Sequence, residues 1–154
     1  MLPIFKRMVL AVAVGAALTA LPGDARAGGY RQYYSSWSYY STTRYYYRTY
    51  YYYPTPVATT YSYHYCVYYP SQPSYVYYYN PVSRQYWGRF EFGEDGKPKG
   101  YSLLAEKDRK EKLADIPASA FPKPAAMPAI PGTSDGEKME APPADLPPKD
   151  LPKE

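Results

Sequence analysis

The chain has 154 residues, a formal net charge of +4 at pH 7, 23 tyrosines, one cysteine and one histidine. A single cysteine excludes an internal disulfide, and one cysteine with one histidine is too few for a four-ligand zinc site or a c-type haem attachment. No catalytic constellation is recognisable, so we expect no cofactor and no enzymatic activity. The tyrosines favour aromatic association or surface binding instead.

The first 27 residues have the order of a secretory signal peptide. Two basic residues (6–7) precede an apolar stretch, 8–21, that is too short for a membrane anchor, and the small residues Ala25 and Ala27 follow it. We expect cleavage after Ala27 and a mature chain, beginning at Gly28, without a transmembrane segment. The protein is then exported to the periplasm, the cell envelope or the extracellular space.

Residues 28–59 form a low-complexity tract of Tyr, Ser, Thr and Arg with almost no aliphatic side chains. Tyrosine and threonine favour strands, but in runs such as 45–47 and 50–53 a one-residue slip replaces one tyrosine by another. The strand register is therefore weakly specified. We expect this tract to be disordered or extended in the monomer and to become strand on assembly.

Residues 60–117 carry the pattern of a small all-β antiparallel meander with about four short strands, followed by one short helix. The four runs of strand character are 61–69, 74–79, 85–92 and 99–104. Asn80-Pro81 predicts a turn, and Asp95-Gly96 predicts a hairpin. Gly88 predicts a bulge or a ring packed close to the backbone.

The C-terminal third differs in composition from the aromatic half. Its first part, 105–114, is charged and predicts the short helix. Residues 118–154 are rich in Pro, Lys and acids, which predicts a disordered, partly polyproline tail. The chain is thus expected to be mostly disordered. A sheet this small, without disulfides, is expected to need help from a partner.

His64 and Cys66 are two positions apart on one expected strand, so their side chains would share a face. A buried thiol is the favoured interpretation of Cys66, an intermolecular disulfide is the second, and metal ligation with His64 is the third. The sequence lacks a Gly-x-Ser-x-Gly elbow and a phosphate-binding glycine loop.

Arginine is the second candidate contact group, because every basic residue between the expected cleavage point and residue 92 is an arginine. An arginine stacked on an exposed aromatic ring contributes about 0.5–1 kcal/mol, and many such contacts add through multivalency. The candidate contact arginines are Arg44, Arg48, Arg84 and Arg89. So few cations argue against a nucleic-acid partner.

The stretch Tyr77-Tyr78-Tyr79-Asn80-Pro81, with the later Trp87, resembles the second hairpin of a WW domain. The likeness covers little more than that hairpin. It implies that Tyr78 and Trp87 would flank a groove for a proline-rich segment, with the chain's own tail as a possible ligand. Local convergence on a stable hairpin sequence is the favoured explanation of the likeness.

Four motifs lie between Tyr61 and about Pro131: Tyr-His-Tyr-Cys, Tyr-Tyr-Asn-Pro, Tyr-Trp-Gly-Arg and Gly-Tyr-Ser-Leu-Leu-Ala-Glu-Lys-Asp-Arg-Lys. This part of the chain resembles a set of small, uncharacterised, tyrosine-rich exported bacterial proteins. The resemblance brings no activity with it. It implies that residues 60–117 are the unit to test.

The sequence therefore predicts an exported, non-enzymatic structural or interaction protein. It would self-associate or bind a cell-envelope component through Tyr-Tyr and Tyr-Arg contacts. The alternative is a small monomeric module that uses an aromatic sheet face to bind a polysaccharide or a proline-rich peptide.

Overall fold

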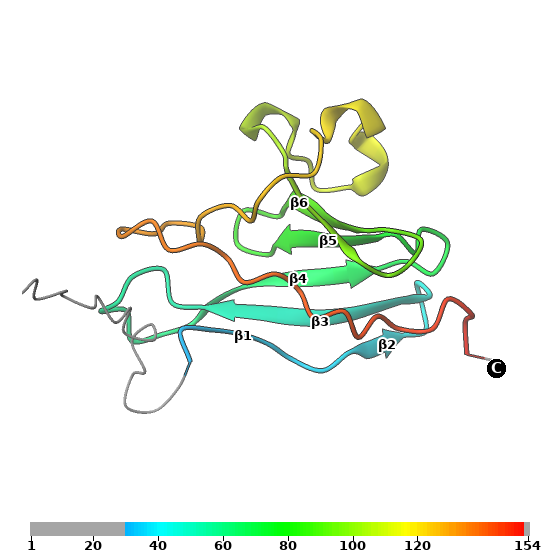
Figure 1. Ribbon diagram of the computed structural model, residues 1–154, viewed down its shortest axis with the longest axis horizontal. Helices are drawn as coiled ribbons and strands as arrows, with labels where there is room; N and C mark the ends of the chain where they lie inside the picture. Colours follow the sequence, from blue (N-terminus) through cyan, green and yellow to red (C-terminus); the bar gives the residue numbers. More distant parts are fainter. Residues whose placement is uncertain (1–29, 153–154) are drawn as a thin grey trace, which may run out of the picture.

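The computed structural model describes residues 30–152, in which seven strands form one curled antiparallel sheet (Figure 1). Its strands are β1 (Gln32–Tyr34), β2 (Ser38–Tyr40), β3 (Tyr45–Tyr52), β4 (Ser62–Tyr68), β5 (Tyr75–Asn80), β6 (Gln85–Phe92) and β7 (Pro98–Leu103). The order is β1-β3-β4-β5-β6-β7, and β2 pairs with β3 on the same edge as β1. The signal peptide predicted for residues 1–27 lies outside the described residues.

The meander predicted for residues 60–117 is confirmed as β4 to β7, and its turns use the expected residues. The Asn80 side-chain oxygen accepts hydrogen bonds from the backbone N–H groups of Val82 and Ser83, at 2.9 and 3.3 Å. In the next hairpin Gly96 has a φ of +76°. This left-handed conformation is one that glycine adopts without steric cost.

Both features predicted for Gly88 are present. The pairs Tyr78↔Gly88 and Tyr79↔Tyr86 leave Trp87 as the extra residue of a bulge in β6. A Cβ atom on Gly88 would lie 2.6 Å from the Tyr101 ring, so only glycine leaves room for that ring. The bulge places Trp87 beside the His64 ring, with 5.4 Å between the ring centroids.

The tyrosine tract before β4 is ordered, so the expectation of disorder is wrong for its described part. β3 pairs with β4 without interruption from Tyr46↔Tyr68 to Tyr52↔Ser62. The register is fixed by residues other than tyrosine. A one-residue slip would move the buried Arg48 side chain to the opposite face, away from its partner Asp145.

The helix predicted for 105–114 is also wrong. The segment contains two separate 3₁₀ turns, η1 (Glu106–Asp108) and η2 (Leu113–Asp115), and a third, η3 (Ala118–Ala120), follows. The backbone is extended at Arg109, whose guanidinium lies 3.7 Å above the Trp87 ring. The Lys110 carbonyl accepts a hydrogen bond from the Tyr86 N–H at 2.9 Å. These contacts with β6 replace a continuous helix.

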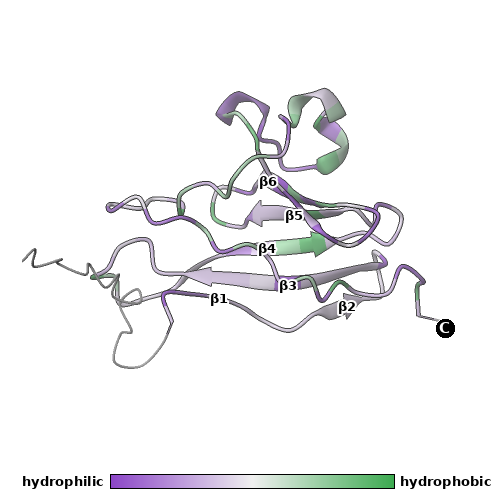
Figure 2. Cartoon of the chain, viewed as in Figure 1, coloured by the Kyte–Doolittle hydropathy of each residue, from purple (hydrophilic) through white to green (hydrophobic). Residues whose placement is uncertain are grey.

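The predicted disordered tail is ordered over residues 118–152, and its later part, the orange and red chain in Figure 1, crosses one face of the sheet. Ile130 and Met139 are 1% and 3% exposed there and pack against the aromatic core. A few aliphatic side chains are enough to order the tail, because the sheet supplies the aromatic side chains of this core. Strands β3 and β5 are pale in Figure 2, since tyrosine has an intermediate hydropathy.

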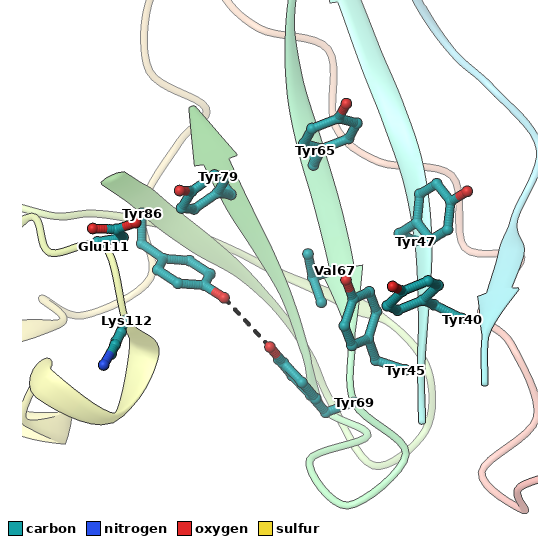
Figure 3. Close-up of a pocket in the computed structure, with 10 residues that line it drawn as sticks. All are labelled: Tyr40, Tyr45, Tyr47, Tyr65, Val67, Tyr69, Tyr79, Tyr86, Glu111 and Lys112. Carbon is teal, nitrogen blue, oxygen red and sulfur yellow. Dashed lines mark hydrogen bonds between the residues drawn. The ribbon is translucent and has the colours of Figure 1, made fainter. Parts of the chain in front are cut away.

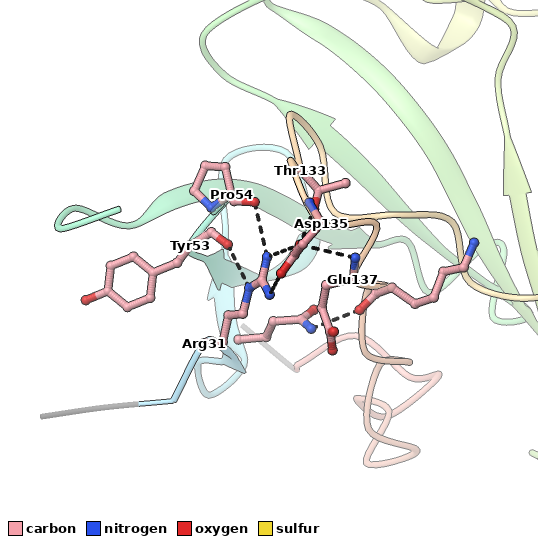
Figure 4. A network of polar contacts seen from close by, with 8 residues as sticks. Arg31, Tyr53, Pro54, Thr133, Asp135 and Glu137 are labelled. Carbon is pink, nitrogen blue, oxygen red and sulfur yellow. Dashed lines mark hydrogen bonds and ion pairs between the residues drawn. The ribbon is translucent and has the colours of Figure 1, made fainter. Parts of the chain in front are cut away.

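Arg31 fastens the tail to the sheet edge (Figure 4). Its guanidinium donates hydrogen bonds to both carboxylate oxygens of Asp135 at 2.6 and 2.8 Å, and to the carbonyls of Tyr53 and Pro54. This bidentate geometry is a strong form of ion pair. It lowers the pKa of the Asp135 carboxyl well below its usual value, chiefly through the hydrogen bond from Arg31.

The tail makes the two faces of the sheet unequal. The covered face, beneath the tail, is formed by Tyr50, Tyr52, His64, Cys66, Tyr68, Val76, Tyr78, Phe90, Phe92 and Tyr101. On the opposite face, a smaller cluster around Tyr77 and Tyr86 packs beneath Leu104, Ile116 and Phe121. Within residues 30–152 no helix is long and apolar enough to cross a bilayer.

Candidate binding surface on the open face of the sheet

Tyrosine rings line the part of the second face that the chain leaves uncovered. Successive side chains of a strand point to opposite faces, so the tyrosines that alternate with buried residues of β3 and β4 gather on this side. Together with neighbours from β1 and the β3–β4 connection they form the open tyrosine face: Tyr33, Tyr47, Tyr51, Tyr61, Tyr63 and Tyr65.

The rings of the open tyrosine face form a continuous row. Tyr33 stacks on Tyr51 with centroids 4.8 Å apart, and Tyr51 contacts Tyr63 at 6.0 Å. The row continues from Tyr63 to Tyr65 at 5.5 Å and from Tyr65 to Tyr47 at 6.4 Å. Aromatic pairs of this kind contribute about 0.5–1.5 kcal/mol beyond buried area, so the rings hold one another in place.

The open tyrosine face is uncharged. Partial burial, followed by the neighbouring phenols, raises the pKa of Tyr33 and Tyr65. Their hydroxyl groups therefore stay protonated at neutral pH and can both donate and accept hydrogen bonds. Tyr33 and Tyr63 are each 38% exposed, so ring faces and hydroxyls are accessible together.

A pocket of about 620 Å³ continues the row (Figure 3). Its lining residues are Tyr40, Tyr45, Tyr47, Tyr65, Val67, Tyr69, Tyr79, Tyr86, Glu111 and Lys112. Tyr47 and Tyr65 belong to both the row and the pocket. The volume lies within the range of about 300–1,000 Å³ that is typical of small-molecule sites.

Both charged residues of the pocket lining come from one segment of the chain. Glu111 and Lys112, in the segment between η1 and η2, lie beside Tyr86 (Figure 3). The Glu111 carboxylate accepts a hydrogen bond from Arg84 at 2.5 Å. Among the lining residues, the Tyr69 and Tyr86 hydroxyls are 3.3 Å apart. Apart from Val67, the remaining lining residues are tyrosines, which offer rings and phenol groups.

No family model, curated protein or solved structure matches this chain. The resemblance to tyrosine-rich exported proteins stays a prediction.

The structure uses two of the four predicted contact arginines internally. Arg48 is 4% exposed and forms an ion pair with Asp145 at 2.8 Å. The Arg89 guanidinium lies between two rings, 3.9 Å from the Tyr75 centroid and 4.1 Å from that of Phe121. Stacking of arginine on aromatic rings is thus present, but here it joins parts of one chain. A partner cannot contact Arg48 while the chain's own tail is in place.

The other two predicted arginines, Arg44 and Arg84, occupy equivalent places in two turns. Each is exposed and ends a four-residue connection, before β3 and before β6 respectively. Their φ values are 56° and 54°, in the left-handed region that favours glycine. The turns share a backbone form in spite of their different sequences.

Tyr78 and Trp87 do not flank an open groove, so this expectation from the WW-like hairpin is wrong. Tyr78 is fully buried on the covered face, where its hydroxyl lies 2.8 Å from that of Tyr34. Trp87 is half-buried between the His64 ring and the Arg109 guanidinium. The tail does cover this face, although it is held by other residues.

Cys66 is fully buried on the covered face, which confirms the first interpretation of its role. Burial raises the pKa of its thiol, so the reactive thiolate is disfavoured. The proposed intermolecular disulfide is inaccessible in this fold. Residues 30–152 contain no cluster of His, Cys, Asp and Glu suited to a metal ion.

His64 shares the covered face with Cys66, as predicted, and neither of its ring nitrogens has a hydrogen-bond partner. Its ring packs 5.6 Å from Tyr52 and 5.4 Å from Trp87. Burial, with a smaller effect from Arg109, lowers the His64 pKa to about 3. The imidazole is therefore neutral at pH 7 and acts as a core aromatic residue.

Proposed function

We propose that this protein is an exported, non-enzymatic binding module that holds a neutral polysaccharide of the cell envelope on its open tyrosine face. The continuous uncharged row of rings, leading into the pocket, carries this proposal. Sugar rings present apolar C–H surfaces that pack on aromatic faces, and their hydroxyls match the phenol groups. Export rests on the N-terminal sequence.

The charge pattern favours a neutral ligand. An acidic polysaccharide or a nucleic acid needs cations along its path. The six tyrosines of the open tyrosine face include no cation, and among the pocket-lining residues Lys112 is the single cation, beside a Glu111 that is paired with Arg84. The stacked tyrosines are also rigid, because their neighbours restrict them, so binding costs little conformational entropy.

The number of carboxylates in the pocket favours binding over cleavage. Glycoside hydrolysis commonly uses two carboxyl groups on opposite sides of the scissile bond. Among the pocket-lining residues Glu111 is the single carboxylate, and it is paired with Arg84. We therefore assign the pocket a role in holding a chain end or a side branch.

The test is affinity electrophoresis and calorimetry of the mature chain with a neutral glucan, hydroxyethylcellulose, and with an acidic polysaccharide, alginate. The double variant Tyr33→Ala/Tyr63→Ala should bind the neutral glucan at least about tenfold more weakly, because two exposed rings are lost. Tyr30→Ala is the matched control, since this tyrosine is 80% exposed but lies outside the row. High salt should leave binding unchanged.

Equal affinities of the double variant and of the Tyr30→Ala control for the glucan would show that the open tyrosine face does not bind it. Salt-sensitive binding to alginate alone would reject the neutral ligand. Self-association through the same face is the second candidate, because two such faces could stack on each other. Sedimentation across concentration separates the two candidates. Self-association would be favoured if the natural chain forms dimers that dissociate on the Tyr33→Ala/Tyr63→Ala change, and if the natural chain does not bind the glucan.

A further inference from the structure

The covered face contains a second binding arrangement, in which the sheet holds part of the tail. The docking groove consists of Gln32, Tyr34, Trp37 and Arg48 on β1, β3 and the β1–β2 connection. The docked segment is residues 140–148, Glu-Ala-Pro-Pro-Ala-Asp-Leu-Pro-Pro. It runs without helix or strand, and Pro142 and Pro147 are buried.

Aromatic side chains of the groove donate hydrogen bonds to backbone carbonyls of the docked segment. The Trp37 indole N–H donates to the Asp145 carbonyl at 2.8 Å, and the Tyr34 hydroxyl donates to the Glu140 carbonyl at 2.7 Å. The Gln32 side-chain oxygen accepts from the Glu140 N–H at 2.9 Å. Aromatic rings that pack prolines and donate to carbonyls are the common means of recognising extended proline-rich peptides.

Arg48 makes the groove selective for a segment that carries a carboxylate. Its guanidinium contacts both carboxylate oxygens of Asp145, at 2.8 and 3.1 Å. The same group donates to the Ser35 carbonyl at 2.8 Å and lies 4.6 Å from the Trp37 centroid. Because Arg48 is buried and fixed by these neighbours, it presents a preformed cation at one position of the groove.

Nothing in these contacts depends on the groove and the segment being close in sequence. The hydrogen bonds join residues 97 to 108 positions apart. Between the sheet and the docked segment lies a loop that is closed by the Ala129↔Lys138 bridge, with Gly132 and Gly136 at positive φ. The segment is thus a separate ligand that happens to be tethered.

We infer that the docking groove is a recognition site for proline-rich segments carrying a carboxylate, and that residues 140–148 of a second copy of this chain are its partner in trans. In the single chain the tethered segment occupies the groove. A short tether gives an effective concentration in the millimolar range, which keeps the segment on its own sheet until it is weakened or outcompeted.

The test uses the full mature chain with its own segment weakened by Asp145→Lys and Leu146→Ser. Both changes lie in the tail, outside the seven strands, and near-UV circular dichroism verifies that the variant stays folded. A fluorescent peptide of residues 139–152 should bind this variant saturably, at least about tenfold more tightly than it binds the unmodified chain, where the tether competes. A peptide carrying Asp145→Lys should bind the variant about 10- to 100-fold more weakly.

A second measurement inverts the charge of the groove. The Arg48→Glu chain should prefer the peptide carrying Asp145→Lys over the natural peptide, which reverses the specificity. Near-UV circular dichroism verifies folding, and if Arg48→Glu does not fold, the first measurement decides alone. Absence of saturable binding to the folded tail variant up to about 1 mM peptide, or equal binding of both peptides, overturns the proposal.

Discussion

Tyrosine has opposite roles on the two faces of this sheet. Tyr50 and Tyr51 are neighbours in β3, yet Tyr50 is fully buried and donates its hydroxyl to the Gln32 side chain, whereas Tyr51 is half-buried in the open row. Burial raises the pKa of Tyr50 strongly. The difference is caused by the tail, which covers one face. Composition alone does not decide whether a tyrosine is core or binding surface.

The largest expected effect is the difference in stability loss between one tyrosine substitution on the covered face and one on the open tyrosine face. Tyr78→Ala removes a fully buried ring and should lower the free energy of unfolding by about 3–5 kcal/mol. Tyr63→Ala removes a ring that is 38% exposed and should cost less than about 1 kcal/mol. Urea unfolding of both variants measures the contrast. Similar losses would show that the open tyrosine face is also core.

Acid should weaken the covered face through His64. The folded-state pKa is about 3 and the unfolded value is near 6.5. Between these values the unfolded chain binds a proton that the folded chain does not, so stability falls as the pH is lowered from about 6.5, by up to about 1.4 kcal/mol per pH unit. Urea midpoints measured from pH 7 to pH 4 follow this loss.

His64→Phe isolates that contribution from those of the carboxylates. It keeps a ring against Tyr52 and Trp87, and it removes two buried nitrogens without partners. The variant should be at least as stable as the natural chain at pH 7 and should lose less stability on acidification. An unchanged pH dependence would assign the acid sensitivity to other groups, such as Asp135 and Asp145.

Loosening the tail should have a moderate effect. Asp145→Ala removes the carboxylate bound by Arg48 and should lower stability by about 1–2 kcal/mol, because the buried guanidinium loses a charged acceptor. Asp150→Ala, at an exposed position of the same tail, is the control. Chemical unfolding monitored by tryptophan fluorescence compares the two, and equal effects would argue against a specific Arg48 contact.

The smallest effect should be a gain in stability. Arg44→Gly places a residue suited to positive φ at the end of the β2–β3 turn and should stabilise the chain by about 0.5–1 kcal/mol. The turn lies at one end of the sheet and should leave both faces unchanged. Thermal unfolding provides the measurement, and a lower midpoint would show that the arginine side chain stabilises the turn more than its backbone strain costs.

The sequence predicted the strands and turns that depend on local signals. Alternation defined β4, Asn80 and Gly96 defined two turns, and the glycine within β6 indicated a close ring. These features follow from the geometry of a few adjacent residues. The open face was predicted only as an aromatic face, since alternation does not show which side a distant segment will cover.

The ordered tract and tail could not be predicted, because each depends on the other. The register of β3 is fixed by Arg48, whose partner Asp145 is 97 residues away. The tail has few aliphatic residues of its own and becomes ordered through Ile130 and Met139 on the aromatic sheet. Low hydrophobicity indicates disorder only when no preformed surface can supply the missing contacts.

The long separation between β3 and its cover also affects how the chain is made. About a hundred residues must follow Arg48 before Asp145 can reach it. At ribosomal rates of about 5–20 residues per second, the tyrosine strands exist for about 5–20 seconds without their cover. During that interval both faces are bare and aromatic, which exposes the nascent chain to aggregation.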